Sequence, residues 1–584
     1  MDKRRSELNI EGVRHTLAHV LAEAVLKKFP KAKLGIGPVI ESGFYYDFLL
    51  LRPLSPDDLK EIEGEMRGII KRGFKIVGKK VTPAEAKKLF KDQPFKLELV
   101  KDFIKEKKQL TVYYTEPGVF YDLCKGGHVK NSSEINPDAF KLNKVAGAYW
   151  KGIEKNKMLT RIYGLAFETK KELDSHLTML AEAEKRDHRR LGRELDLFTQ
   201  SDLVGAGLPL FTPKGALIRE ILEDYVGKLN KKYGYQKVWI PHITKPELYK
   251  VSGHWEKFKD DLFHVKGGTD EFVLKPMNCP HHTQIYASRP RSYKDLPIKY
   301  FETTTVYRNE QSGELGGLTR VRSITQDDGH TFLREGQIEE EISRMLEMQS
   351  KILSAVGFND YWIRLSLRNP KNKKMYLGDD KTWDKAQKIM ADILKKKKIE
   401  FKSAEGEAAF YGPKMDLMIR DSLGREWQVS TIQLDFNMPY RFSLTYTDEN
   451  GEKQTPVMIH RAFMGSTERF IGILIEHFAG AFPLWLAPVQ VALLSINDKV
   501  KEYCLQIIRE LHKENLRVWL DDRNETLGKK IREAELQKIP YILVIGEKEK
   551  SSGLINVRER GIKEQKTIKL DEFIKNMSLK EKAA

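Results

Sequence analysis

The stretch TVYRNEQSGELGGLTRVRSITQDDGHTF, residues 305–332, decides the fold. Its β-branched and aromatic residues predict two strands joined by a Gly-rich loop, the first ending at Arg308 to Glu310 and the second beginning at Arg320. Residues two apart on a strand share a face, so Arg308 and Glu310 are expected to project together, as are Arg320 and Arg322. Guanidinium groups suit phosphate oxygens, and a carboxylate can accept a hydrogen bond from an exocyclic amine. The alternative is an edge hairpin with solvated charges.

A second stretch, HRAFMGSTERFIGILIEHFAGAFPLWLAP at residues 460–488, combines a polar turn with an apolar helix. The turn at 465–469 leads directly into the helix, so Arg469 is expected near the positive end of the helix dipole. Such a position favours an anion. Taken alone, Arg469 fits an ordinary surface charge better than an anion site.

The flanking segments predict further elements. Thr212 as an N-cap and Pro213 as the first helical residue predict an amphipathic helix that runs to about Lys232 and stops at Gly234. The apolar run KVWIPHI that follows predicts a strand. Between about 270 and 486, strand-like runs dominate, and they include PIKYFETTTVYR, REWQVSTIQLDF and TPVMIHRAF.

Two other regions differ from this pattern. Residues 169–195 are charged, Leu-punctuated at helical spacing and free of Pro, which predicts a helical connector between domains. After Pro488, the apolar runs VQVALLSI, RVWLD and YILVIG alternate with helical stretches, the βαβ pattern of a parallel sheet. No GxGxxG motif follows the first of these runs, which argues against a dinucleotide site there.

Composition narrows the class of protein. The 584 residues include 101 Lys and Arg against 83 Asp and Glu, a net charge of +18. This excess favours a polyanionic partner, nucleic acid first and an anionic membrane surface second, although solubility alone is the alternative. Three cysteines cannot build a disulfide framework, and Pro483 and Pro488 interrupt the longest uncharged stretch. We therefore expect a soluble, cytoplasmic protein that has no membrane partner.

Together these segments resemble the signature motifs of class II aminoacyl-tRNA synthetases. The helix at 213–232 with KVWIPHI is similar to the first motif, usually a dimer interface; residues 305–332 resemble the second, and GSTERF the third. SGHWEKF, KPMNCPHH, TQDDGHTF, AFYGPKMD, WQVSTIQLDF and VMIHRA closely resemble the threonyl-tRNA synthetase family, over residues 12 to about 575. Many bacterial members carry an extra small N-terminal domain. Only 14 residues precede His15 here, so that domain is expected to be absent.

The resemblance implies a multidomain α+β and α/β chain. We expect an α+β editing domain at 1–168 and a helical linker at 169–195. A class II catalytic core built on an antiparallel sheet is expected at 196–486, and an α/β anticodon-binding domain at 487–584.

The implied reaction is the ATP-dependent ligation of L-threonine to tRNA(Thr) through a threonyl-adenylate, by a likewise implied homodimer. Arg308 would bind the α-phosphate of ATP, Arg469 the γ-phosphate and Glu310 the adenine amine, with Mg²⁺ bridging phosphates. Arg320 is a further ATP-binding residue by resemblance. His254 would assist the transfer to tRNA, although a capping or structural role is the alternative.

The family also holds one catalytic-core Zn²⁺, at positions that match Cys279, His330 and His460. These residues are 51 and 130 residues apart, unlike any compact zinc-finger spacing. Three protein ligands leave coordination open for the amine and hydroxyl of threonine. A site built around a substrate hydroxyl rejects the isostere valine by roughly 10⁴–10⁵. By resemblance, the threonine pocket is completed by Gln326, Asp328, Tyr411, Lys414, Gln428 and Gln433.

Serine is the harder competitor, because one methyl group is worth only roughly 10–200-fold in selectivity. A second, hydrolytic site is therefore expected. HTLAH puts His15 and His19 on one helical face, and with DLCKGGH it resembles the editing domain shared by threonyl and alanyl synthetases. The implied editing residues are His15, His19, Asp122, Cys124 and His128, with Lys96 as a further candidate. The cluster could hold zinc or position water without metal, and we expect no permanent metal there.

Anticodon contacts are implied in the C-terminal domain. The matching positions are Asn524, Arg532, Lys538, Glu549 and Arg558. Lys538 stands where an arginine is common, and it keeps the charge but loses the bidentate fork. The rival functions are a non-catalytic RNA-binding paralogue, which should lack the ligands and motif arginines present here, and a different class II synthetase.

Overall fold

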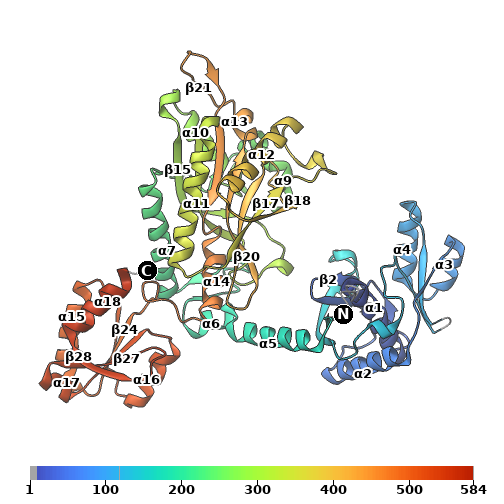
Figure 1. Ribbon diagram of the computed structural model, residues 1–584, viewed down its shortest axis with the longest axis horizontal. Helices are drawn as coiled ribbons and strands as arrows, with labels where there is room; N and C mark the ends of the chain where they lie inside the picture. The colour runs from blue at the N-terminus through green and yellow to red at the C-terminus, as the bar shows by residue number, and fades with distance from the viewer. Residues whose placement is uncertain (1–8, 117–118, 583–584) are drawn as a thin grey trace, which may run out of the picture. The chain divides into compact units, whose positions relative to one another are not determined.

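The computed structural model describes residues 9–116 and 119–582, and the chain divides into two compact units. The first comprises the described residues up to Ala181, and the second begins at Glu182. The division falls inside helix α5 (Lys170–Arg186), which Figure 1 shows as the element that joins them.

The first unit contains two sheets. Helix α1 (Ile10–Lys28) packs on the larger sheet and runs beside α2 (Pro56–Arg72). Asn9 caps α1 by accepting the Gly12 N–H, and a Ser55–Asp58 capping box begins α2. The larger sheet comprises β1 (Lys33–Leu34), β2 (Val39–Ile40), β3 (Gly43–Leu49), β8 (Met158–Ala166) and β7 (Phe140–Tyr149). The smaller one comprises β4 (Val77–Lys80), β5 (Thr111–Glu116) and β6 (Phe120–Leu123), with α3 (Pro83–Leu89) and α4 (Pro94–Lys105) beside it.

The second unit is built on an eight-stranded sheet. Its strand order is β11 (Gln236–Lys237), β15 (Ile298–Tyr307), β16 (Ser323–Leu333), β23 (Val457–Ala462), β20 (Glu426–Asp435), β19 (Lys414–Arg420), β17 (Tyr361–Leu367) and β18 (Phe401–Glu405). Only the two edge pairs are parallel, so the central sheet is antiparallel, as expected.

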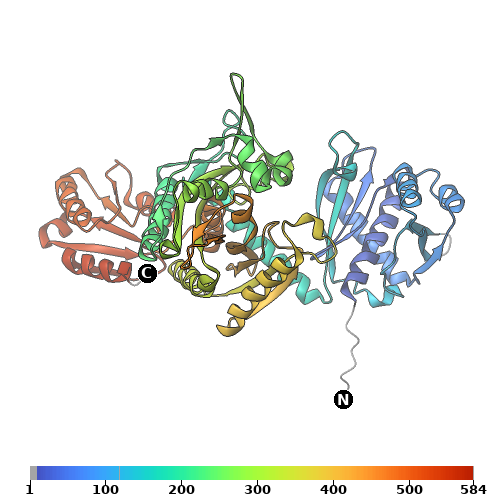
Figure 2. The ribbon, with the colours of Figure 1, turned by 90° about the horizontal axis from the view of Figure 1, so that it is seen from above.

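The two faces of this sheet differ in chemistry. Apolar residues such as Met415, Ile432 and Ile459 belong to the main core. The helices on that core face are α7 (Pro213–Lys232), α11 (Ile338–Ala355), α12 (Asp380–Lys396) and α14 (Thr467–His477). Figure 2 shows these helices gathered around the strands. Neighbouring positions along the same strands carry polar residues on the opposite face, and this alternation is what builds the site described below.

Several predicted elements are confirmed. Helix α7 begins at Pro213 behind a Thr212 cap and ends at Lys232, and Gly234 follows with a φ of 82°. The three strand-like runs form β15, β20 and β23. The predicted connector is helical, but it breaks at Asp187, which caps a second helix, α6 (His188–Glu194).

Two strand predictions are wrong. Within KVWIPHI, only Lys237 belongs to β11 and only Ile243 to β12 (Ile243–Thr244). Pro241 has no N–H and cannot donate a hydrogen bond to a neighbouring strand, so it interrupts the expected strand. Arg308 and Glu310 lie beyond the end of β15, and Arg320 and Arg322 precede the start of β16, so these four residues belong to the loop.

The last hundred residues form a mixed sheet. The three predicted runs are β24 (Val491–Ser495), β25 (Val518–Asp521) and β26 (Tyr541–Ile545), and they pair in parallel as expected. Two further strands, β27 (Leu554–Glu559) and β28 (Gln565–Lys569), add antiparallel pairs that the βαβ pattern did not predict. The helices here are α15 (Lys501–Lys513), α16 (Leu527–Leu536), α17 (Glu547–Ser552) and α18 (Leu570–Lys582). Among the helices of the described residues, none has the length and apolar character needed to cross a membrane.

Candidate functional site

Cys279, His330 and His460 come together on the polar face of the large sheet. Their candidate ligand atoms all lie within 4.8 Å of one another, and all three side chains are buried. His330 and His460 are direct cross-strand partners on β16 and β23, while Cys279 is the first residue of helix α10 (Cys279–Ala287). Sheet register and a helix start therefore assemble residues that are far apart in the sequence.

Neighbouring side chains orient the two imidazoles. His460 Nε2 lies 2.9 Å from Asp435 Oδ2, whereas its Nδ1 is buried and has no hydrogen-bond partner among the described residues. His330 Nδ1 lies 2.7 Å from His282 Nδ1, which leaves Nε2 on the side of Asp328, 3.8 Å from Oδ1. Each ligand imidazole thus has one nitrogen held and one free, as metal-bound histidines do. A thiol and two such imidazoles fit Zn²⁺.

The predicted threonine-pocket residues lie on this polar face. Gln433 pairs with His460 on one side and with Lys414 on the other, so these side chains form one row across β23, β20 and β19. Tyr411 stacks on the His460 ring at 4.7 Å between centroids, and its hydroxyl donates to Gln433 Oε1. The row ends in a buried carboxylate, Asp416, whose oxygens accept from Lys414 at 2.6 Å and Gln428 at 2.9 Å.

Asp328 sits beside the three metal-ligand candidates. Asn278 Nδ2 donates to its Oδ2 at 3.0 Å. Burial raises the pKa of Asp328, although the Asn278 hydrogen bond opposes this. Two residues earlier on the same strand, Gln326 has an amide oxygen that is buried and unpaired within the described chain. Both residues therefore offer acceptors on the predicted pocket face.

His254 is buried against the same cluster. It begins α9 (His254–Phe258), its Nδ1 lies 2.8 Å from Ser252 Oγ, and its Nε2 lies 3.6 Å from Cys279 Sγ. Burial, helped by the nearby His460 and Arg308, lowers the pKa of His254 to about 3. The ring is therefore neutral at physiological pH and keeps a lone pair on one nitrogen.

The motif arginines lie in the loop and at the helix start. Arg308 places its guanidinium 4.9 Å from the centre of the Phe258 ring and 3.1 Å from Met277 Sδ. Arg469 lies in the first turn of α14, where Ser466 caps the helix by accepting the Arg469 N–H. Glu310 binds Arg320 Nη2 at 2.7 Å, so the loop joins two of the predicted ATP-binding residues directly.

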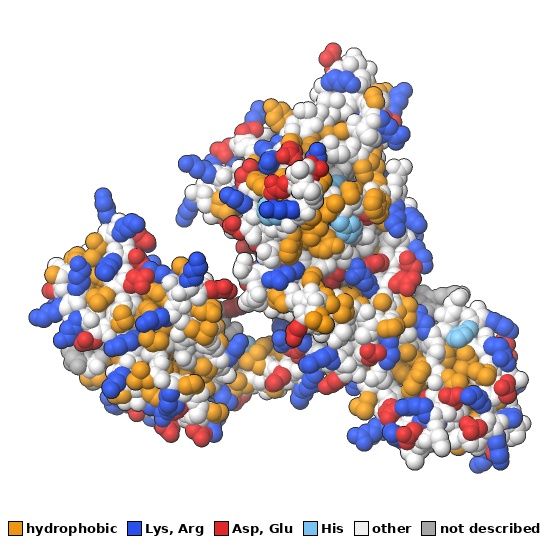
Figure 3. Space-filling model, turned by 180° about the vertical axis from the view of Figure 1, so that it is seen from behind, with side chains coloured by type: hydrophobic (Ala, Val, Ile, Leu, Met, Phe, Trp, Pro, Cys, Tyr) orange, Lys and Arg blue, Asp and Glu red, His pale blue; other side chains and the backbone are white. Residues whose placement is uncertain are grey.

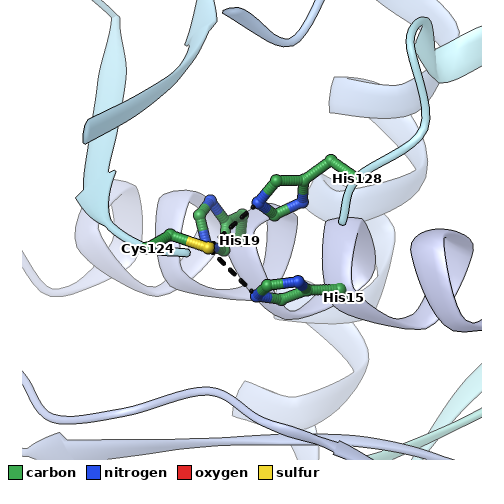
Figure 4. A group of neighbouring side chains, drawn as sticks. All are labelled: His15, His19, Cys124 and His128. Carbon is green, nitrogen blue, oxygen red and sulfur yellow. Dashed lines mark hydrogen bonds between the residues drawn. The ribbon is translucent and has the colours of Figure 1, made fainter. Parts of the chain in front are cut away.

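The predicted editing residues of the first unit also come together. His15 and His19 project from α1, and Cys124 and His128 lie on the loop after β6, as Figure 4 shows. Cys124 Sγ lies 3.3 Å from His15 Nε2 and 3.3 Å from His128 Nε2. The ligand atoms of all four residues lie within 4.8 Å of one another.

Protonation states in this cluster follow from burial. Burial raises the pKa of the Cys124 thiol to about 11, and it lowers the pKa of His128 to about 2 with help from His19 and His15. Thr16 Oγ1 donates to the Gly12 carbonyl and accepts from the Val129 N–H. At neutral pH the cluster therefore holds a thiol and neutral imidazoles, a set that can orient a water molecule.

A buried carboxylate lies behind the histidines. Asp122 accepts from Lys96 Nζ at 2.5 Å and from the Tyr46 hydroxyl at 2.5 Å, and it lies 3.9 Å from His19 Nε2. Lys96 is only 2% exposed and also lies over the Tyr46 ring. The structure thus brings together every editing residue that the sequence suggested, Lys96 included.

The five predicted anticodon residues all lie in the last hundred residues, but on different elements. Arg532 is on α16, Arg558 on β27 and Glu549 on α17, where Glu549 accepts from the Gly546 N–H. Lys538 has a φ of 56° and lines a cavity of about 410 Å³ with Lys214 and Phe482. Asn524 is exposed in the loop before α16.

Comparisons with known proteins bear on this arrangement. Family models match residues 258–478 (tRNA synthetase class II core domain, G, H, P, S and T), 490–580 (anticodon binding domain) and 110–163 (Threonyl and Alanyl tRNA synthetase second additional domain). A threonine–tRNA ligase from Gloeobacter violaceus is 49% identical over 577 residues, 97% of this chain and 91% of that protein. One from Rubrobacter xylanophilus is 48% identical over 94% of this chain and 85% of its own length.

The chain belongs to the threonine–tRNA ligase family. A solved threonyl-tRNA synthetase chain from Cryptosporidium parvum, described as an RNA binding domain, is 38% identical with a TM-score of 0.64, covering 67% of this chain and 98% of its own. A prolyl-tRNA synthetase from Giardia lamblia, 18% identical with a TM-score of 0.55 over 69% of this chain and 80% of its own, shares the fold. The resemblance, the class II core and the ligase activity expected from the sequence are confirmed.

Several residues that support these predicted sites have no clear signal in the sequence. Asp435 ends the run WQVSTIQLDF, and an acid at a strand end is only a weak signal. His282 lies three residues after Cys279, but its position in the sequence does not indicate that it contacts His330. Tyr46 and Thr16 lie in ordinary apolar runs, and only the fold brings them to Asp122 and His128.

Proposed function

We propose that the polar face of the large sheet catalyses threonyl-adenylate formation. Arg308 and Arg469 would neutralise the phosphates of ATP, with Mg²⁺ bridging phosphates. Glu310 would contact the adenine amine, and Arg320 would be a further contact to ATP. The desolvated guanidinium of Arg308, with its Nε buried and unpaired in the described residues, supports this role. Positioning and charge neutralisation supply most of the catalysis in phosphoryl chemistry of this kind. The carboxylate of threonine would attack the α-phosphorus and release pyrophosphate.

Selection of threonine rests on the same face. Cys279, His330 and His460 would hold Zn²⁺, which when bound supplies open coordination positions for the substrate amine and β-hydroxyl. Asp328 would accept from the β-hydroxyl, and Tyr411 would close the pocket over His460. The single observation that carries this proposal is the free, buried Nδ1 of His460, whose other nitrogen is held by Asp435.

Transfer to tRNA would use His254. Burial keeps the imidazole neutral, so Nε2 has a lone pair with which to accept a hydrogen bond from the attacking hydroxyl while Nδ1 stays on Ser252. The terminal ribose hydroxyl of tRNA is the group that loses its proton in this step. The contact of His254 Nε2 with Cys279 Sγ supports this role, because Cys279 belongs to the proposed substrate site.

Hydrolysis of seryl-tRNA(Thr) is the proposed role of the first unit. His15, His19, Cys124 and His128 would position the attacking water, and the buried Asp122 would orient His19. Lys96 binds the other carboxylate oxygen, Oδ1, and the Tyr46 hydroxyl donates to Oδ2, so both hold Asp122 in place. The pocket would admit serine and exclude the extra methyl group of threonine.

The basic charge of the chain suits a tRNA partner. Figure 3 shows Lys and Arg side chains spread across the visible face. We propose that Asn524, Arg532, Lys538, Glu549 and Arg558 read the anticodon. Such a contact set makes affinity fall with salt, because each neutralised phosphate releases counterions.

A homodimer is supported by exposed apolar side chains near the first motif. Trp239 is 76% exposed and Ile243 is 47% exposed, and both belong to the run that follows α7. Leu210, just before α7, is also exposed. Large exposed apolar side chains of this kind are typical of a protein–protein interface.

Charging of tRNA(Thr) tests the proposal as a whole. The zinc-loaded full chain should form threonyl-tRNA(Thr) and one AMP for each threonine ligated. Bound zinc should be one ion per chain by elemental analysis. A fully zinc-loaded, folded protein that charges no tRNA(Thr) would contradict the proposal and favour the RNA-binding paralogue.

A further inference from the structure

A cluster of Asp187, His188 and Glu476 lies outside both sites, where α6 meets α14; His188 and Glu476 are buried and Asp187 is half-buried. These three residues have the spacing of a metal site. Both ring nitrogens of His188 are already used, however: Nδ1 lies 2.6 Å from Glu476 Oε1, and Nε2 accepts from the Leu318 N–H at 3.0 Å. No lone pair remains for a metal, so the cluster has a different role.

The hydrogen bonds define the tautomer of His188. A backbone N–H can only donate, so Nε2 of His188 accepts a hydrogen bond from the Leu318 N–H. Nδ1 therefore carries the ring proton and donates a hydrogen bond to Glu476. Although burial opposes it, hydrogen bonds from His188 lower the pKa of Glu476. Arg425 Nη2 also contacts the Glu476 carboxylate at 2.6 Å. The ring is therefore fixed from one side by an ionised, paired carboxylate, and His188 itself is only 5% exposed.

The other side of the ring holds a turn of the loop between β15 and β16. Leu318 is fully buried in the main core, and His188 is the acceptor for its N–H. Gly317 has a φ of 62°, and a Cβ at that position would lie 2.3 Å from His188 Nε2. The turn closes through the Gly316 N–H, which donates to the Arg320 carbonyl at 3.1 Å.

This turn sets the position of the charged end of the loop. Arg320 is the last residue of the turn, and its guanidinium binds Glu310 Oε2 at 2.7 Å and Glu314 Oε2 at 2.9 Å. Arg322 Nε donates to the Glu310 carbonyl at 3.0 Å. A shift of the turn would therefore move the Arg320 guanidinium and the Glu310 carboxylate together.

We propose that His188 is a positioning residue for ATP, which holds the Gly316–Arg320 turn so that Arg320 and Glu310 meet the nucleotide. This inference rests on the proposed ATP role of those two residues. His188 does not touch the polar sheet face where threonine would bind. Its loss should therefore change the interaction with ATP and leave the interaction with threonine unaltered.

Two substitutions distinguish the hydrogen bond to the Leu318 N–H from the hydrogen bond to Glu476. The amide of Gln reaches the position of Nε2 and can accept from Leu318, whereas the amide of Asn stands near Nδ1 and can donate only to Glu476. In ATP–pyrophosphate exchange, His188→Asn should raise KM for ATP about tenfold, the effect of leaving one buried N–H unpaired. KM for threonine should stay at the wild-type value, and His188→Gln should restore KM for ATP towards it.

Thermal unfolding of the same variants excludes a merely structural effect. His188→Gln loses the Glu476 bond, so it should be destabilised at least as much as His188→Asn while binding ATP better. If His188→Asn fails to fold, Gly317→Ala replaces it, because the added Cβ displaces the same contact with His188 intact. A wild-type KM for ATP in the folded variant, or a parallel rise in KM for threonine, would overturn the inference.

Arg320→Ala separates this inference from the proposed function. Wild-type ATP kinetics in Arg320→Ala would remove the ATP role of Arg320, and the inference with it. Weakened ATP binding in Arg320→Ala alongside an unaffected His188→Asn would overturn only the positioning role of His188.

Discussion

Asp435 Oδ2 lies 2.9 Å from His460 Nε2, and this contact fixes which nitrogen of His460 faces Cys279 and His330. Asp435 is fully buried at the end of β20, and its other oxygen, Oδ1, accepts the N–H groups of Asn437 and Met438. The carboxylate therefore cannot turn away, and it holds the ring with Nδ1 directed at the ligand cluster.

Asp435→Asn should lower the affinity for zinc by about 10–100-fold, the usual effect of losing a partner that orients a metal-bound histidine. Competition with a chromophoric chelator measures this affinity. Cys279→Ser, which removes a proposed ligand, should lose more zinc and should also lose threonine activation. Unchanged zinc affinity in Asp435→Asn would show that His460 needs no orienting partner.

Arg308→Ala should reduce the rate of ATP–pyrophosphate exchange by about 10²–10³, because a preorganised charge at the reacting phosphate is removed. Binding of tRNA should change little, since the guanidinium lies against Phe258 and Met277 on the proposed catalytic face. Arg289→Ala, an exposed arginine just beyond α10, is the matched control. Equal exchange rates for both variants would make Arg308 an ordinary charge.

A His15→Ala, His19→Ala double variant should keep threonine charging and lose hydrolysis of preformed seryl-tRNA(Thr). The two histidines contact Cys124 and His128 in the first unit, whereas the proposed ligase site belongs to the second. The assay follows deacylation of seryl-tRNA(Thr) by wild type and variant. Equal hydrolysis by both proteins would show that the histidines are not the editing residues.

Cys124 should react slowly with iodoacetamide at neutral pH, because burial raises the pKa of its thiol to about 11. Only the thiolate reacts, so the alkylation rate should climb steadily as pH rises towards that value. Mass spectrometry of the Cys124 peptide from chelator-treated full-length protein gives the rate at each pH. A plateau below pH 8 would mean that the thiolate is stabilised, and it would contradict the water-positioning account.

Much of the fold could be predicted from the sequence, because local patterns determine it. The helix at 213–232 has its cap, its Pro and its terminal Gly in place, and the long strands alternate in polarity. The strand predicted at KVWIPHI is wrong because β11 ends at Lys237, and Pro241 cannot extend it. Arg320 and Arg322 were misplaced because the loop carries charges at strand-like spacing, whereas β16 starts only at Ser323.

The sites were predictable only through family resemblance. No spacing rule links Cys279 to His330 and His460, because their proximity comes from the pairing of β16 with β23 and from the start of α10. HxxxH is a local signal, but its meeting with Cys124 and His128 depends on how β6 packs against α1. Supporting residues such as Asp435 and His188 act through contacts that a sequence does not contain.

ATP–pyrophosphate exchange with threonine, serine and valine in turn tests the central claim, that the cluster of Cys279, His330 and His460 reads the β-hydroxyl. Threonine should support the fastest exchange. Serine, which lacks only a methyl group, should fall behind by roughly 10–200-fold, and valine, which lacks the hydroxyl, by roughly 10⁴–10⁵. Activation of valine as efficient as that of serine would contradict the account.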